Sequence, residues 1–210
     1  MELEFPSNIG DYLPKYLSAE SFDEIISQLK AFPVDGTKDT IYTTFLKDKQ
    51  IVFQGDGIAN LPFYDAQTQR VLLDKPGIIL SNTCDIDPRN ERKDDMHICF
   101  APILRLSKYI ERLSGKYDND KIIAHIENIK KQIITHVIYL PKGGDLAYDA
   151  IVPLDRVCYV SSSFINRDDL PANRLFTLSN FGNYLFLLKI SIHFTRIREK
   201  VDRYKGIFLE

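Results

Sequence analysis

The segment from Lys75 to Asp87 holds the side chains best suited to chemistry. An apolar run at 78–80 is typical of a buried strand, and hydroxyl, amide, thiol and carboxylate groups follow it at 81–85. If residues 77–84 and 97–104 pair as a hairpin, Cys84 lies near His97, while His97 and Cys99 share one face of their strand. This strand end is the first candidate site.

A thiol enzyme is one interpretation of these residues. Cys84 would be the nucleophile activated by His97, with Asp85 beside them and Asn82 or backbone N–H groups stabilising an oxyanion. The alternative is that Cys84 packs as a small apolar residue and His97 lies in a solvated loop. The absence of a local family-type signature around either residue favours this alternative.

Metal binding is less favoured than either interpretation. A zinc site would need Cys158 as its fourth ligand, because the Cys-His-Cys set lacks paired CxxC spacing. A calcium loop beginning at Asp85 fails because Arg89 and Asn90 stand where an oxygen ligand and a glycine are needed. We therefore expect neither a metal nor a cofactor, and we favour a structural role for Asp85 as the acceptor of an Asx-type turn over a catalytic one.

Positive charge around the strand end is a second possible source of function. Arg89 and Arg92, with Lys93 and Lys75, could surround the site and suit a phosphate-bearing ligand. The carboxylates interleaved with them in the same loop favour the alternative, a solvated loop whose charges cancel.

Composition excludes several classes of protein. With 44% hydrophobic residues among 210, the chain can bury a full core. A formal net charge of −2 gives no global electrostatic footprint for nucleic acid, so such binding would need a local patch. No secretion signal or membrane-length apolar run is present, and three widely spaced cysteines are typical of reduced thiols. We expect a cytoplasmic protein that does not bind membranes.

The pattern of apolar, turn and capping residues predicts one compact α+β unit. We expect helices at about 19–31, 107–113, 120–132 and 180–203, and strands at 40–46, 50–53, 58–64, 70–73, 77–84, 97–104, 134–140 and 150–160. An N-terminal arm, a helix and the first strand occupy 1–46. A β-barrel with a helical insertion at about 107–132 occupies 47–165, and a C-terminal helix packed on the barrel lies within 166–210.

The predicted C-terminal helix is a candidate interaction surface. Ser179 is its expected cap, and the first half, FGNYLFLLKISIHF, is apolar nearly all round. Such a helix is buried on most faces or lies in an interface. One barrel cannot easily cover every face, so we expect a partner protein or a second copy of the chain to dock on it.

The order of several short segments resembles the PemK/MazF family of small β-barrels. A Gly55-Asp56 strand precedes a Lys75-Pro76-led apolar strand, and Ala101-Pro102-Ile103, residues 135–137 and residues 150–160 are similar to later parts of that fold. The resemblance covers about residues 50–165, without the insertion. A second, narrower resemblance is to an uncharacterised bacterial group found near phage-defence genes. It is carried by SNTCDID at 81–87, LPKGG at 140–144 and the C-terminal helix.

The PemK/MazF resemblance implies a partly open barrel that, in many members, cleaves single-stranded RNA in toxin–antitoxin or defence systems. This chain lacks the closing-strand arginine, with Pro153 and Cys158 at those places, although Asp155 and Arg156 remain. Lys75 stands where an arginine is usual and lacks the planar fork that clamps phosphate. These departures weaken the case for catalysis, which needs a base for the 2′-hydroxyl and an electrophile for the phosphate.

We therefore expect a non-secreted bacterial interaction or nucleic-acid-binding module. The alternative is a hydrolase, either a metal-free endoribonuclease using Asp155 and nearby cations or a Cys84–His97 thiol enzyme. The expected ligand-binding residues are Gly55, Asp56, Lys75, Ser81, Asn82, Thr83, Arg89, Arg92 and Arg156, and the candidate catalytic residues are Cys84, Asp85, His97 and Asp155.

Overall fold

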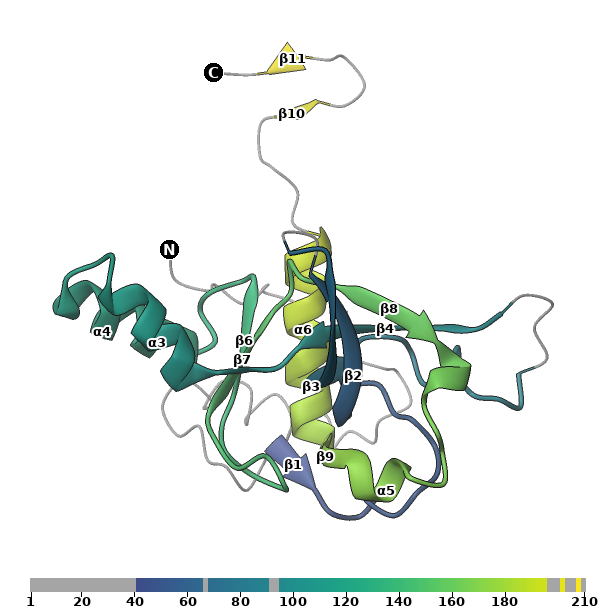
Figure 1. Cartoon of the computed structure of the whole chain (residues 1–210). Helices are drawn as coiled ribbons and strands as arrows, with labels where there is room; N and C mark the ends of the chain where they lie inside the picture. Colours follow the sequence, from purple (N-terminus) through teal and green to yellow (C-terminus); the bar gives the residue numbers. More distant parts are fainter. Residues whose placement is uncertain (1–40, 66–67, 91–94, 196–200, 203–206, 209–210) are drawn as a thin grey trace, which may run out of the picture.

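The computed structural model describes residues 41–65, 68–90, 95–195, 201–202 and 207–208. The helix expected at 19–31 and Arg92 lie outside this part of the chain. The described residues form a mixed α+β fold, as the sequence predicted, with two larger antiparallel sheets, a helix packed among them and a separate pair of short strands (Figure 1).

The larger sheet has six strands. In spatial order they are β1 (Tyr42–Thr43), β9 (Arg174–Leu178), β2 (Gly57–Asp65), β3 (Arg70–Ile79), β4 (His97–Pro102) and β8 (Cys158–Ser161). The smaller sheet has the order β5 (Leu104–Arg105), β7 (Ala150–Pro153) and β6 (Val137–Leu140). Two further short strands, β10 (Val201–Asp202) and β11 (Ile207–Phe208), pair with each other.

The helices fall into two groups. The insertion forms α3 (Leu106–Ser114) and α4 (Asn119–Lys130), which pack on the smaller sheet on the side away from α6 (Figure 1). The other helices are the single 3₁₀ turn η2 (Ser162–Phe164), α5 (Leu170–Asn173) and α6 (Asn180–Thr195). Both helices of the insertion are confirmed close to their predicted bounds, because apolar residues such as Ile122, Ile126 and Ile129 recur at helical spacing and are buried.

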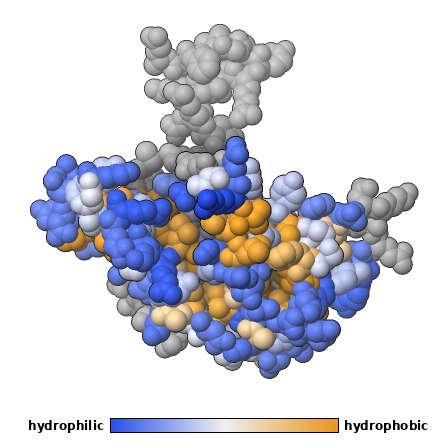
Figure 2. Space-filling model, in the orientation of Figure 1, coloured by the Kyte–Doolittle hydropathy of each residue, from blue (hydrophilic) through white to orange (hydrophobic). Residues whose placement is uncertain are grey.

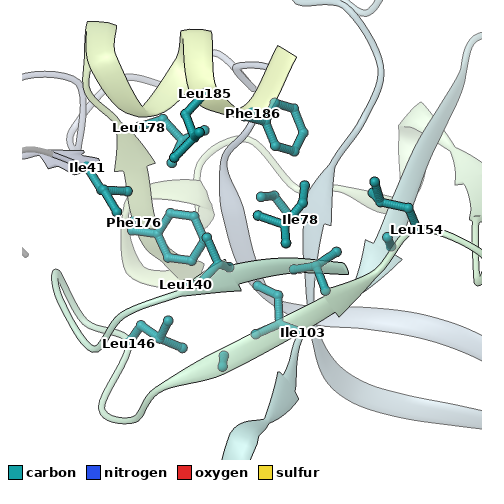
Figure 3. Packing of buried hydrophobic residues seen from close by; sticks show 14 of the residues in the cluster. Ile41, Ile78, Ile103, Leu140, Leu146, Leu154, Phe176, Leu178, Leu185 and Phe186 are labelled. Atoms are coloured by element: carbon teal, nitrogen blue, oxygen red, sulfur yellow. The ribbon is translucent and has the colours of Figure 1, made fainter. Parts of the chain in front are cut away.

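Helix α6 is buried on most of its surface by the fold itself. Phe181, Leu185 and Phe186 pack against strands of both sheets (Figure 3). The predicted cap is confirmed, since Ser179 Oγ accepts a hydrogen bond from Gly182 N at 3.0 Å. A Cβ atom at Gly182 would lie 2.2 Å from the Ile41 carbonyl oxygen, so only glycine fits this contact. The faces that we expected a partner to cover are thus largely covered within the chain.

The larger sheet curls around a second core without closing into a barrel. Residues from β2, β3, β4 and β8 surround an apolar interior that includes Leu61, Ile79 and Phe100. Strand β8 approaches β2 where Cys158 Sγ accepts a hydrogen bond from Tyr64 N. Among the described strands, however, β8 and β2 do not form a ladder, so the sheet is open.

The prediction of a strand at 50–53 is wrong. Of the strand predicted at 40–46, only β1 (Tyr42–Thr43) is present. Residues 44–56 form an irregular loop wrapped around Arg174. Arg174 Nη1 donates to the carbonyls of Leu46, Lys47 and Lys49 at 2.6–3.0 Å, and Arg174 Nη2 donates to Ile51 O. These carbonyls bind a guanidinium instead of a neighbouring strand, which explains why a β-prone sequence does not form one.

Other strand boundaries are also corrected. The run 150–160 is not one strand, because a turn at 154–157 divides it into β7 and β8 in different sheets. The segments 70–73 and 77–79 instead join as β3, which ends at Ile79 and not at Cys84 and has an irregularity near Asp74, whose φ is +57°. The C-terminal helix does not reach Arg203, since Val201–Asp202 is a strand. In the described part of the chain, no helix combines the length and apolar character needed to cross a membrane.

Candidate functional site

The predicted hairpin at the strand end is confirmed. Strands β3 and β4 pair in the register Ile79↔Phe100, and Leu80 N donates to Cys99 O at 2.8 Å. Side chains alternate along β4, so that His97 and Cys99 are exposed while Ile98 is buried. The strand end is therefore exposed to solvent beside the outer surface of β4.

The polar side chains at the strand end mainly hold the backbone in place. Ser81 Oγ accepts from Cys99 N at 2.8 Å, and Asn82 Oδ1 accepts from Cys84 N at 2.9 Å. Thr83 Oγ1 accepts from Gln54 N at 2.9 Å. Each side chain satisfies an amide that would otherwise lack a partner where regular pairing stops. These residues therefore shape the backbone at the strand end, where Asn82 is exposed and Ser81 and Thr83 are half-buried.

The catalytic pairing of Cys84 with His97 has no supporting contact in the described residues. His97 Nδ1 lies 3.0 Å from Asp95 O, and its ring packs edge-on against Tyr159. Cys84 is exposed, and its carbonyl oxygen accepts from Asn90 Nδ2. Within the same ranges, no group of three or more His, Cys, Asp or Glu side chains is placed to hold a metal ion.

The loop cations are partly neutralised. Arg89 makes a two-pronged ion pair with Asp87, whose pKa is lowered to about 2 by hydrogen bonds from the Arg89 side chain and backbone. Arg167, which sequence reasoning missed, packs beneath this loop and donates to Ile86 O at 3.1 Å. Burial lowers the pKa of Arg167, and Asp87 acts against that change. In the described part of the loop, Asp87 therefore neutralises Arg89, and residues 91–94, which carry the other charges of the prediction, lie outside the described residues.

Gly55 and Asp56, expected as ligand-binding residues, lie in the interior. Asp56 is fully buried and pairs with Arg174 at 3.0 Å, while its Oδ2 also accepts from Phe53 N. Burial raises the pKa of Asp56, and the positive charge of Arg174 opposes that increase. Gly55 has φ +84° and fits against Leu178. Neither residue presents a surface to a ligand, and the structure gives both an architectural position.

The remaining predicted residues are exposed but dispersed. Lys75 lies on β3 opposite Leu61. Asp85 is exposed in the turn after Cys84, whereas Asp155 and Arg156 are exposed in the turn between β7 and β8. The structure therefore does not gather the predicted site into one cluster.

An exposed aromatic surface is the feature that sequence reasoning missed. Cross-strand pairing places His97 opposite Ser161 and Cys99 opposite Tyr159, on the outer surface of β4 and β8. Tyr159 is 72% exposed, and its ring centroid lies 5.5 Å from that of His97 at an interplanar angle of 69°. We call His97, Cys99, Tyr159 and Ser161, together with Tyr64 on β2, the aromatic face.

Tyr64 is included in the aromatic face because the curl of the larger sheet brings β2 next to β8. It is 61% exposed, and its backbone N–H donates to the sulfur of Cys158, the residue before Tyr159. The adjoining residues of β3, Val71, Leu72 and Leu73, are also exposed. Figure 2 shows hydrophobic side chains at the surface over β2 and β3. Alternation in Cys158–Ser161 predicts that Tyr159 points outward, but only the register of β4 and β8 brings its ring beside His97.

No protein-family model matches the chain, and comparison with curated proteins finds no relative.

Proposed function

We propose that this protein is a binding module for single-stranded RNA that stacks bases on the aromatic face. The observation that carries the proposal is Tyr159, a large aromatic side chain 72% exposed on a sheet surface and flanked by the imidazole of His97. Bases stacked on aromatic side chains are stabilised by about 1–3 kcal/mol each, whatever their identity. Such a surface favours unpaired strands, because a duplex hides the faces of its bases.

A cation near Tyr159 supplies phosphate contacts. Arg70 pairs with Asp65, the residue after Tyr64, so it lies at the same end of the β2–β3 hairpin but on the opposite face of the ladder from Tyr64. Arg156 is exposed three residues before Tyr159. A strand stacked on Tyr159 would offer its phosphates to the nearby Arg156 guanidinium, and guanidiniums are well suited to phosphate. With so few cations, binding should be moderate and weaken with salt.

The wider setting rests on the resemblance to PemK/MazF proteins. A partly open barrel of that kind would present its outer surface to RNA, and the context would be a cytoplasmic toxin–antitoxin or phage-defence system. The curl of the larger sheet around its own apolar core supports this fold. Cleavage by Asp155 or by Cys84 with His97 is not part of the proposal, because no contact among the described residues favours it.

The test is direct binding in EDTA, which excludes divalent metals. A fluorescein-labelled 12-nucleotide oligouridine should raise its anisotropy with the protein, and the same strand in a duplex should bind more weakly. Tyr159→Ala should weaken single-strand binding about fivefold or more. Phe45→Ala is the matched control, because Phe45 is an aromatic side chain 83% exposed next to β1 at the opposite edge of the sheet. Equal affinity for duplex and single strand would refute the proposal.

A further inference from the structure

A cluster of histidine, tyrosine and arginine side chains lies where the helical insertion meets the smaller sheet. Tyr109 of α3 and His125 of α4 are joined by a hydrogen bond of 2.9 Å between the hydroxyl and Nε2, with ring centroids 5.9 Å apart. The guanidinium carbon of Arg112 lies 5.8 Å from the centre of the Tyr109 ring. We call Tyr109, Arg112, His125, His136 and Arg156 the histidine–tyrosine cluster.

Packing of the insertion brings Tyr109, Arg112 and His125 into contact, and the charges of His136 and Arg156 act on Tyr109 and His125. The helices share an apolar core with β6 and β7, including Ile126, Ile129 and Val137. Leu154 N donates to His136 O at 2.9 Å, so the ladder of β6 and β7 continues to His136, and Arg156 follows two residues later. The side chains therefore come from four segments that a rigid core positions.

The electrostatics of the cluster are cationic. Burial raises the pKa of Tyr109, and the positive charges of Arg112 and Arg156 act in the opposite direction. Burial lowers the pKa of His125, and its neighbour His136 lowers it further. Carboxylates also lie close in sequence: Asp155 precedes Arg156, Glu111 precedes Arg112, and Glu127 lies two residues after His125. Glu111 is paired with Lys108 at 2.9 Å, and Asp155 is exposed in its turn. An anion among these groups would relieve the repulsion that they exert on one another.

We propose that the histidine–tyrosine cluster binds a phosphate monoester, either of a free nucleotide or at the 5′ end of a strand. Arg112 stacks beside the Tyr109 ring and would supply guanidinium donors for phosphate oxygens, and Arg156, whose charge also acts on Tyr109, would supply more. The imidazoles of His125 and His136 add further donors, and the Tyr109 hydroxyl orients the His125 ring through its hydrogen bond. A divalent metal does not suit this site, because Arg112 and Arg156 would repel it.

This site is independent of base stacking. It shares Arg156 with the proposed RNA path, but its other residues belong to the insertion and to the approach to β6, whereas the aromatic face lies on β2, β4 and β8. Loss of RNA binding by the aromatic face would leave phosphate binding intact. The Tyr159→Ala variant should therefore bind adenosine monophosphate as the wild type does.

Nuclear magnetic resonance of the histidine side chains tests the proposal. The chain has four histidines, so single His→Gln variants assign every ring signal. Adenosine monophosphate should shift the signals of His125 and His136 and leave those of His97 and His193 in place. Inorganic phosphate, a 5′-phosphorylated hexanucleotide and a 5′-hydroxyl hexanucleotide complete the series. The phosphorylated compounds should shift the His125 and His136 signals, and the 5′-hydroxyl strand should leave them unchanged.

Charge-neutral variants locate the binding residues. Arg112→Gln and Arg156→Gln should each weaken binding about tenfold or more, because each loses charge-assisted hydrogen bonds. Lys108→Gln and Lys121→Gln are the controls, since these lysines lie on the same two helices and pair with Glu111 and Asp118. Wild-type affinity in both arginine variants would overturn the proposal, as would equal shifts at all four histidines. Equal binding of the 5′-hydroxyl strand would overturn the preference for a monoester.

Discussion

Lys189 offers a quantitative test of the core. It lies in α6 with 2% of its surface exposed, and its Nζ donates to Gln132 O at 2.8 Å and Ile134 O at 2.6 Å. Burial lowers its pKa from the ordinary value of 10.5 to about 7, because a poorly solvated site disfavours the ammonium. The stability of the protein should therefore depend on pH in a range where few other groups titrate.

The sign and size follow from proton linkage. Between pH 7 and pH 10.5 the unfolded chain keeps the Lys189 proton and the folded protein loses it, so the free energy of unfolding rises with pH. Below about pH 6 both states are protonated, and this contribution is constant. From pH 6 to pH 9 the gain amounts to about 2.5 kcal/mol.

Urea unfolding followed by circular dichroism at pH 6, 7, 8 and 9 measures this gain. The comparison is between wild type and Lys189→Met, which removes the titrating group and nearly keeps the volume of the side chain. The wild-type free energy of unfolding minus that of the variant should increase by about 2.5 kcal/mol over the range. The slope is the test, because the variant also leaves the carbonyls of Gln132 and Ile134 without their donor. Lys108→Met controls for loss of an exposed lysine.

A difference that stays constant from pH 6 to pH 9 would refute the reasoning. It would mean that Lys189 keeps an ordinary proton affinity in the folded state, and that its hydrogen bonds to the two carbonyls hold the ammonium charged.

Two further predictions concern the loop and the thiols. Arg174→Met should lower the free energy of unfolding in urea by about 3–5 kcal/mol, because Asp56 would be left buried without its partner; a loss below about 1 kcal/mol would contradict this role. With an aromatic disulfide reagent, the exposed Cys84 and Cys99 should react before the half-buried Cys158, whose pKa is raised by burial. A Cys158→Ser variant that loses the fastest phase would contradict that order.

Much of the fold could be predicted where the signal is local. The insertion helices follow from apolar residues spaced along one face, and the cap at Ser179 follows from residue type and position. The loop at 44–56 could not be predicted, because its carbonyls bind Arg174 more than a hundred residues away. Strands β7 and β8 read as one apolar run, since membership of a sheet depends on distant partners. Strand β9 was missed altogether.

The candidate site was only partly predictable for the same reason. Pairing of β3 with β4 follows from alternation and turn residues, and it correctly placed His97 and Cys99 on one exposed face. The use of Ser81 and Thr83 as backbone acceptors depends on Cys99 and Gln54, which only the fold brings close. The aromatic face depends on the curl of the sheet, which residue patterns do not specify.

Base stacking on Tyr159 is the central claim, and one ratio tests it most directly. The affinity of a single-stranded 12-nucleotide RNA should be nearly the same for wild type and Tyr159→Phe, because the ring remains. It should fall about fivefold or more for Tyr159→Ala, as expected for loss of about 1 kcal/mol or more of stacking. Equal affinities of the Phe and Ala variants would contradict the claim, because binding would then not use the ring.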